Sequence, residues 1–103
     1  MPISIMTEEE QLAHVQKNGH EISYISNPNL QVQLAAVKQN GRAIIFIKNP
    51  SLEVQLAAVR QNGRAIRYIQ YPSEIVCLAA IRQDPKVIEL ISNPTLEMQL
   101  LAS

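Results

Sequence analysis

The sequence predicts an all-α fold, an α-solenoid of about four and a half helix-turn-helix repeats of 22 residues each. An X-Pro dipeptide recurs at that spacing, starting at Asn27, Asn49, Tyr71 and Asn93. A leucine also occupies one place in every copy, at Leu12, Leu34, Leu56, Leu78 and Leu100. Fixed periods of about 20 to 50 residues are typical of elongated arrays whose units share a core by stacking. The predicted repeats are residues 7–26, 29–48, 51–70 and 73–92 with a partial repeat at 95–103, all in one domain spanning residues 1–103.

The first part of each repeat predicts an amphipathic α-helix of about ten residues. Leu52, Leu56 and Val59 have the i, i+4, i+7 spacing of one helix face. Each helix follows a residue type that caps helix N-termini, namely Thr7, Asn29, Ser51, Ser73 and Thr95. Thr7 and Glu10 have the spacing of a capping box. The proline before each cap keeps its own predecessor out of the right-handed helical region, so the preceding helix ends there.

The second part of each repeat predicts a shorter helix of about eight residues. A strand would bury the column Ser23, Ile45, Arg67 and Glu89, which is too polar for a core. Asp84-Pro85 is an N-cap followed by proline at the first helical position, and Asn18, Asn40 and Asn62 take the same capping position. We expect the aromatic column Tyr24, Phe46 and Tyr68 to lie in the core. A leucine-rich-repeat horseshoe is the alternative, because its period also fits.

The two ends of the array suggest different roles. We expect residues 1–6 to cover the first repeat, because Ile3 falls in the column of Ile25. The last helix carries Leu100 and Leu101 with no second helix behind it, whereas terminal repeats normally have a polar outer face. An apolar open end predicts a homodimer formed through the C-terminal helix.

Composition excludes several classes of protein. Nine basic and nine acidic residues leave no net charge, so nothing global indicates a nucleic-acid or membrane protein. No apolar run reaches the ~20 residues that span a bilayer, and the N-terminus lacks the pattern of a secretory signal. The single cysteine, Cys77, cannot form an internal disulfide. These features predict a soluble cytoplasmic protein.

No pattern in the sequence indicates an enzyme, a metal site or a cofactor. His14 and His20 lie near the N-terminus with no cysteine or carboxylate at ligand spacing. Cys77 stands where other repeats have glutamine, so we expect it to be half-exposed and unreactive. The three glycines are single turn residues, not a phosphate-binding loop.

Six basic residues fall into two columns that flank the turn between the paired helices. The first column is Lys38, Arg60 and Arg82, and the second is Arg42, Arg64 and Lys86. Stacking would align both columns in one basic ridge along an edge. Basic residues at a helix C-terminus complement the helix dipole, which accounts for the first column as a solvated surface. The second column begins the short helix, where free amide N–H groups beside a guanidinium would bind an anion.

Departures from the repeat mark a second candidate surface. Tyr71 replaces asparagine, Ile75 replaces glutamine or glutamate, and Glu74 stands where leucine is expected. One interpretation is that this helix is rotated by one position, so that Ile75 fills the place of the leucine. The other is that Tyr71 and Ile75 form an exposed apolar patch that anchors a protein partner.

The pattern L-A-A-V-[KR]-Q-[ND]-[GP]-x-[AV]-I-x-[YFL]-I resembles a short helical repeat family described only as a domain of unknown function. It is also similar to leucine-rich-variant repeats, which carry Asn-Pro and Asp-Pro at a slightly longer period. The resemblance covers residues 7–103. It implies alternating short helices in a superhelix and no catalytic residues.

Taken together, these features predict a non-enzymatic protein-protein interaction module, an adaptor or an occluding inhibitor. The basic ridge would bind an acidic surface of a protein partner. One alternative is binding of nucleic-acid backbone or of a phosphorylated small ligand along the same edge. Zero net charge and aromatic residues expected in the core argue against nucleic acid. Another alternative is a structural repeat that assembles with itself.

Overall fold

The structure, a computed structural model, describes residues 6–103, and all regular secondary structure in that range is helical. Its α-helices are α1 (Glu8–Lys17), α2 (Leu30–Gln39), α3 (Leu52–Gln61), α4 (Glu74–Gln83) and α5 (Leu96–Ala102). Between them lie the 3₁₀ helices η2 (Gly19–Tyr24), η3 (Gly41–Phe46), η4 (Gly63–Tyr68) and η5 (Pro85–Leu90). The described residues contain no strand, so the all-α prediction is confirmed and the horseshoe alternative is wrong. The predicted cover over the first repeat depends on Ile3, which lies outside the described residues.

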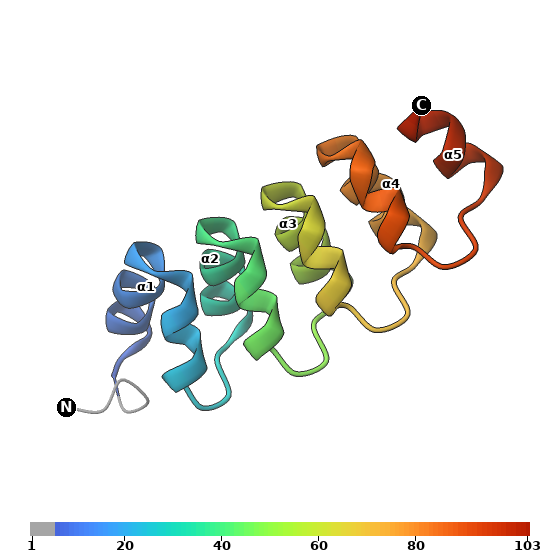
Figure 1. The fold of residues 1–103 in the computed structure, drawn as a ribbon. Coiled ribbons are helices and arrows are strands. Elements are labelled where there is room, and N and C mark those ends of the chain that lie inside the picture. Colours follow the sequence, from blue (N-terminus) through green and yellow to red (C-terminus); the bar gives the residue numbers. More distant parts are fainter. Residues whose placement is uncertain (1–5) are drawn as a thin grey trace.

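The repeats follow one another in a single row, with α1 and α5 at opposite ends (Figure 1). Each α-helix packs on the next α-helix and on the 3₁₀ helices of its own and the preceding repeat. The row measures 50 × 21 × 16 Å along its principal axes. Its radius of gyration of 14.5 Å exceeds the ~13 Å of a compact domain of this length. The helical-repeat architecture predicted from the 22-residue period is therefore present.

The α-helices begin where the capping residues predict. Four of the five caps accept a hydrogen bond from a backbone N–H in the first turn, and Ser73 is the exception. The capping box is present: the Thr7 N–H donates to Glu10 Oε1 at 2.9 Å, and Glu10 N–H donates to Thr7 Oγ1 at 3.2 Å. That hydrogen bond from the Thr7 backbone lowers the pKa of the Glu10 carboxyl.

The second helix of each repeat is shorter and tighter than expected: six residues of 3₁₀ helix instead of about eight residues of helix. In a helix with three residues per turn, side chains three apart lie above one another. Ile44 in η3 and its C-cap residue Ile47 both face the core, where 1% and 7% of their surfaces are exposed. The variable column predicted to lie outside the core, Ser23, Ile45, Arg67 and Glu89, is exposed in all four repeats.

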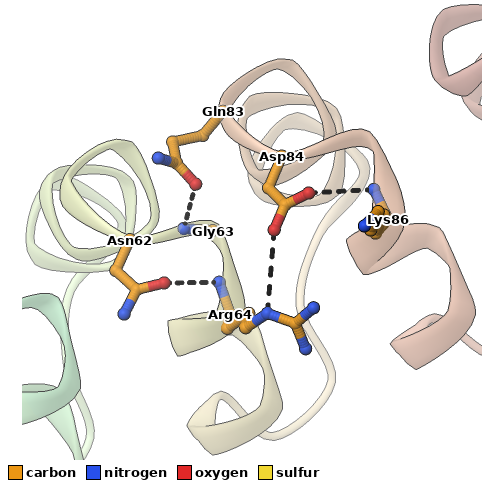
Figure 2. Close-up of polar contacts among 6 residues, drawn as sticks. All are labelled: Asn62, Gly63, Arg64, Gln83, Asp84 and Lys86. Atoms are coloured by element: carbon orange, nitrogen blue, oxygen red, sulfur yellow. Dashed lines mark hydrogen bonds and ion pairs between the residues drawn. The ribbon is translucent and has the colours of Figure 1, made fainter.

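A glycine and a glutamine join neighbouring repeats. The Gly63 N–H donates to Gln83 Oε1 of the next repeat at 2.6 Å, as Figure 2 shows. Gly41 donates in the same way to Gln61, and Gly19 to Gln39. A Cβ on Gly63 would lie 2.7 Å from the Ala80 carbonyl oxygen, and the approach is closer still at the two other glycines. Since none of the glycines has positive φ, glycine is needed here for the close approach of two repeats.

The loops between repeats share one geometry. The residue before each loop proline is left-handed: Asn27, Asn49, Tyr71 and Asn93 have φ of 50°, 50°, 55° and 53°. Asparagine tolerates this region better than most residues, whereas tyrosine is strained there. A glutamine in the following helix closes the loop, as when Gln55 Nε2 donates to the Pro50 carbonyl oxygen at 3.0 Å. In the fourth repeat Cys77 takes the place of that glutamine, with its sulfur 4.0 Å from the Pro72 oxygen.

The core is one continuous row of apolar side chains between the two helix layers. Val37, Ile44 and Val59 are all at most 1% exposed. The leucines that recur in every repeat are only partly buried in the core. Leu34 is buried, Leu12, Leu56 and Leu78 are half-buried, and Leu100 is 65% exposed. The leucines thus line the outer grooves between helices as well as the core.

Candidate binding surface

All six side chains of the predicted basic ridge are exposed. Among residues 6–103, only Arg64 of the six has an acidic partner, with its Nε 3.7 Å from Asp84 Oδ2. The side chain of Arg64 remains 54% exposed in that ion pair. Lys38, Arg42, Arg60, Arg82 and Lys86 form no ion pair with a carboxylate among residues 6–103, although Glu8 lines the same groove as Lys38.

The prediction of free amide N–H groups at the start of the second helix is wrong. In the third repeat, the Gly63 N–H donates to Gln83, the Arg64 N–H to Asn62 Oδ1 at 3.0 Å, and the Ala65 N–H to the Asn62 carbonyl. In the second repeat the Arg42 N–H likewise donates to the cap side chain of Asn40, and in the fourth repeat the Lys86 N–H donates to that of Asp84. Any anion at this edge would have to be bound by side chains alone.

The first basic column lines grooves between successive α-helices. A groove of about 530 Å³ between α1 and α2 is lined by Leu12, Gln16, Leu34, Ala35, Lys38 and Gln39, among others. A groove of about 400 Å³ between α3 and α4 is lined by Arg60, Ala79, Arg82 and Gln83. Each of these four residues is 44 positions after a lining residue of the first groove. The same groove therefore recurs along the α-helical face, with Arg60 at the position of Gln16 and Arg82 at the position of Lys38.

The second basic column lines a different pocket, on the 3₁₀ side. A pocket of about 130 Å³ between η3 and η4 is lined by Arg42, Asn62, Arg64, Arg67 and Tyr68. None of these three pockets is lined by residues of both basic columns, so we consider the two columns as separate candidate sites. Arg67 was not among the six residues of the predicted ridge. It belongs to the variable column with Ser23, Ile45 and Glu89, which the sequence marks as another place where specificity could be encoded, and it is the one basic residue of that column.

Charge also varies along the row of repeats. Residues 29–70 contain six basic residues and one acidic residue, Glu53. The acidic residues are concentrated in the flanking repeats, where residues 6–28 hold four and residues 71–103 hold four. The neutral chain is therefore acidic at both ends and basic in the middle. Electrostatic attraction of an acidic partner would be strongest over the second and third repeats.

The structure distinguishes the two interpretations of Tyr71 and Ile75. Val76 is fully buried, as are Val32 and Val54 at the same position of other repeats, so α4 is not rotated. Ile75 is instead 58% exposed and Tyr71 is 90% exposed. Both side chains are therefore exposed, and the anchoring of a protein partner by Tyr71 and Ile75 stays a prediction. Ile75 also shares one face of α4 with Ala79 and Arg82, because these residues are spaced i, i+4, i+7.

Two sequence-based expectations about burial are wrong. Cys77 is 3% exposed instead of half-exposed. This burial raises the pKa of its thiol, and the negative charge of nearby Glu74 makes a smaller contribution in the same direction. The aromatic column is not core: Tyr24 and Phe46 are 65% and 45% exposed, and Tyr68 is half-buried. The 3₁₀ geometry turns this column outward, which removes one argument against nucleic-acid binding.

Other candidate chemistry is sparse in the described part of the chain. His14 Nδ1 lies 3.8 Å from Glu21 Oε1, and His20 packs edge-on against the Phe46 ring. Residues 6–103 hold no group of three or more His, Cys, Asp or Glu side chains placed to bind a metal. Over the same range no helix combines the length and the apolar character needed to traverse a bilayer.

The last helix exposes apolar side chains. Leu96 and Leu100 are 70% and 65% exposed, whereas Met98 is buried and Leu101 is half-buried against the core. The homodimer expected through this helix stays a prediction.

Comparisons with protein-family models, with curated proteins and with solved structures found no match to this chain. The resemblance to leucine-rich-variant repeats therefore stays a prediction, and function has to be inferred from the surface itself.

Proposed function

We propose that this protein is a non-enzymatic module that binds an acidic surface of a protein partner through its α-helical face. The observation that supports this most directly is the row formed by Lys38, Arg60 and Arg82. These side chains are exposed, have no acidic partner among residues 6–103, and line recurring grooves between α-helices. A partner that carries carboxylates would supply the missing counter-charges.

The apolar contribution would come from the same helices. The groove between α3 and α4 is lined by Arg60, Arg82 and the buried Ala79, and the exposed Ile75 lies on the same face of α4 as Arg82. Exposed apolar side chains next to arginines are typical of the central contacts of protein interfaces. An acidic partner segment with an apolar anchor fits this combination.

Tyr71 supports an interface that continues along α4. It is strained in the left-handed region and 90% exposed, so packing within the chain gives no reason for a tyrosine there. Backbone strain without a local packing reason is concentrated at binding sites. Tyr71 precedes α4 and Arg82 lies near its end, so the contact would extend for about 15 Å along the helix.

The test compares two double variants that change the charge equally. Arg60→Glu with Arg82→Glu reverses the groove, and Lys17→Glu with Lys48→Glu reverses two exposed lysines that line neither groove. Each is used to capture proteins from nuclease-treated extract of the source cells at about 50 and 200 mM salt, with circular dichroism as the check on folding. We expect the groove variant to lose acidic proteins that the lysine variant retains. Equal capture by the two variants would reject the groove as the binding site.

The nuclease treatment addresses the alternative of nucleic-acid binding. Proteins that depend on bridging nucleic acid disappear after digestion, whereas direct partners remain. Loss of all capture after digestion would favour the nucleic-acid alternative over an acidic protein.

A further inference from the structure

The pocket between η3 and η4 is a second candidate site with chemistry of its own. Arg42, Arg64 and Arg67 bring three guanidinium groups to a pocket that no carboxylate lines. Its volume of about 130 Å³ is well below the ~300–1,000 Å³ of pockets for drug-sized ligands. Space of this size suits a single small anion.

Neighbouring contacts hold two of the pocket side chains in place. Arg42 Nη2 donates to Tyr68 Oη at 3.3 Å, so the tyrosine oxygen is occupied as an acceptor while its own O–H remains free to donate. Arg64 is held through Nε by Asp84. In Figure 2 the terminal nitrogens of Arg64 point away from Asp84. These nitrogens have no hydrogen-bond partner within residues 6–103.

The equivalent places in the other repeats show that this chemistry is particular to the middle of the array. Between the first and second repeats, the same positions hold His20, Asn40, Arg42, Ile45 and Phe46, and the histidine packs on the phenylalanine ring. Between the third and fourth repeats they hold Arg64, Asp84, Lys86, Glu89 and Leu90, so two carboxylates balance two bases. Backbone geometry is shared by all three places, yet only one gathers three arginines. The difference therefore lies in side-chain chemistry and not in a requirement of the fold.

We propose that Arg42, Arg64, Arg67 and Tyr68 form a site for a phosphate dianion, either inorganic phosphate or the phosphate group of a monoester. Guanidinium groups bind phosphate through paired, charge-assisted hydrogen bonds, and the Tyr68 hydroxyl adds a neutral donor. A dianion also relieves the repulsion among three like charges in one small pocket. This inference goes beyond the proposed function and does not depend on it, because Lys38, Arg60 and Arg82 do not line this pocket.

The test uses substitutions that the repeat itself supplies. Arg67→Ile introduces the residue of the second repeat at that position, and Tyr68→Phe does the same for the aromatic column. The control Lys48→Ser removes one exposed positive charge outside the pocket and introduces the serine found in the first and fourth repeats. Each introduced residue already occurs at the equivalent position of another repeat.

Binding is measured by calorimetry and by ³¹P NMR at constant ionic strength. The probes are inorganic phosphate, an uncharged peptide carrying one phosphoserine, and a short single-stranded oligonucleotide. We expect Arg67→Ile to weaken phosphate binding by about tenfold or more, the size of effect for losing a hydrogen bond to a charged group. Tyr68→Phe should weaken it severalfold, and Lys48→Ser by less than about twofold. Tighter binding of the phosphopeptide than of inorganic phosphate assigns the site to a phosphorylated side chain, and equal binding assigns it to free phosphate.

Three results would overturn the proposal. The first is no measurable binding of either inorganic phosphate or the phosphopeptide to the intact chain. The second is an equal loss of affinity in Arg67→Ile and Lys48→Ser, which would indicate only diffuse charge. The third is an oligonucleotide that binds more tightly than both of these probes and depends on Arg67, which would assign the pocket to a phosphodiester. Phosphate binding that survives Arg60→Glu with Arg82→Glu would show that this site stands even if the proposed protein interface fails.

Discussion

Substituting Gly63 by alanine tests the contact that joins the third repeat to the fourth. The added Cβ would lie 2.7 Å from the Ala80 carbonyl oxygen, closer than real Cβ atoms approach backbone. That oxygen cannot move freely, because it accepts the Asp84 N–H bond that ends α4 at 2.9 Å. The two repeats must therefore separate, which also stretches the bond from Gly63 N–H to Gln83.

Two opposing effects set the magnitude. Overpacking of a close contact costs roughly 1–3 kcal/mol, and replacing glycine by alanine returns about 0.4–1 kcal/mol by restricting the unfolded chain. We expect a net loss of about 1–2 kcal/mol in the free energy of unfolding. At roughly 4–8 °C per kcal/mol for a chain of this size, Tm should fall by about 5–15 °C.

The assay is urea and thermal unfolding followed by circular dichroism, with Gln70→Ala at an exposed position as the control. Gln83→Ala removes the acceptor of the same contact and should cost about 1–2 kcal/mol, because it leaves the Gly63 N–H without its partner. In the double variant the loss of stability should be smaller than the sum of the two single losses, because both substitutions disrupt one contact. A Gly63→Ala variant as stable as the unmodified chain would refute this account of how the repeats meet.

Three further predictions concern single positions. Tyr71→Asn should raise the free energy of unfolding by about 1 kcal/mol, because asparagine relieves the left-handed backbone strain at φ 55°. The same substitution should weaken partner capture if Tyr71 contacts the partner. A lower Tm for the variant would contradict the strain. Ile44→Ala should lower the free energy of unfolding in urea by about 2–5 kcal/mol, since Ile44 is 1% exposed. Ile45→Ala, at a residue that is 54% exposed, should change it by no more than about 0.5 kcal/mol. Similar losses at both positions would contradict the described register. Burial raises the pKa of the Cys77 thiol, so the folded state favours the protonated form. Its contribution to stability is fully present below the pKa of an unfolded cysteine and is lost as pH rises through the higher pKa of the folded thiol. Alkylation of Cys77 by iodoacetamide should therefore need a more alkaline pH in the folded chain than in urea, and identical pH profiles would count against burial.

Much of the fold could be predicted because its signals are local. Thr7 and Glu10 are three residues apart, and the asparagine or aspartate before each 3₁₀ helix caps an amide two residues away. Such contacts need only a short stretch of chain, so residue types at fixed spacing reveal them. The number and order of helices and the exposed variable column follow from this repetition.

The character of the second helix depended on packing. A six-residue segment forms too few hydrogen bonds to decide between α and 3₁₀ geometry by itself. In the 3₁₀ helix Ile44 is buried in the core and Phe46 is 45% exposed. The aromatic column was therefore misplaced in the core, and with it one argument about nucleic acid.

By itself, the sequence determined the period, the helix starts and the set of basic columns, since each is written in residue types close together in the chain. Only the tertiary structure decided which of those residues share a site. Gly63 meets Gln83 and Arg42 meets Tyr68 across repeat boundaries, at separations of 20 and 26 residues. Those separations depend on the rise and twist between repeats, which side-chain packing sets and a linear pattern does not contain. In the stacked repeats, Arg60 and Arg82 line a groove between α-helices, whereas Arg42 and Arg64 line a pocket on the 3₁₀ side.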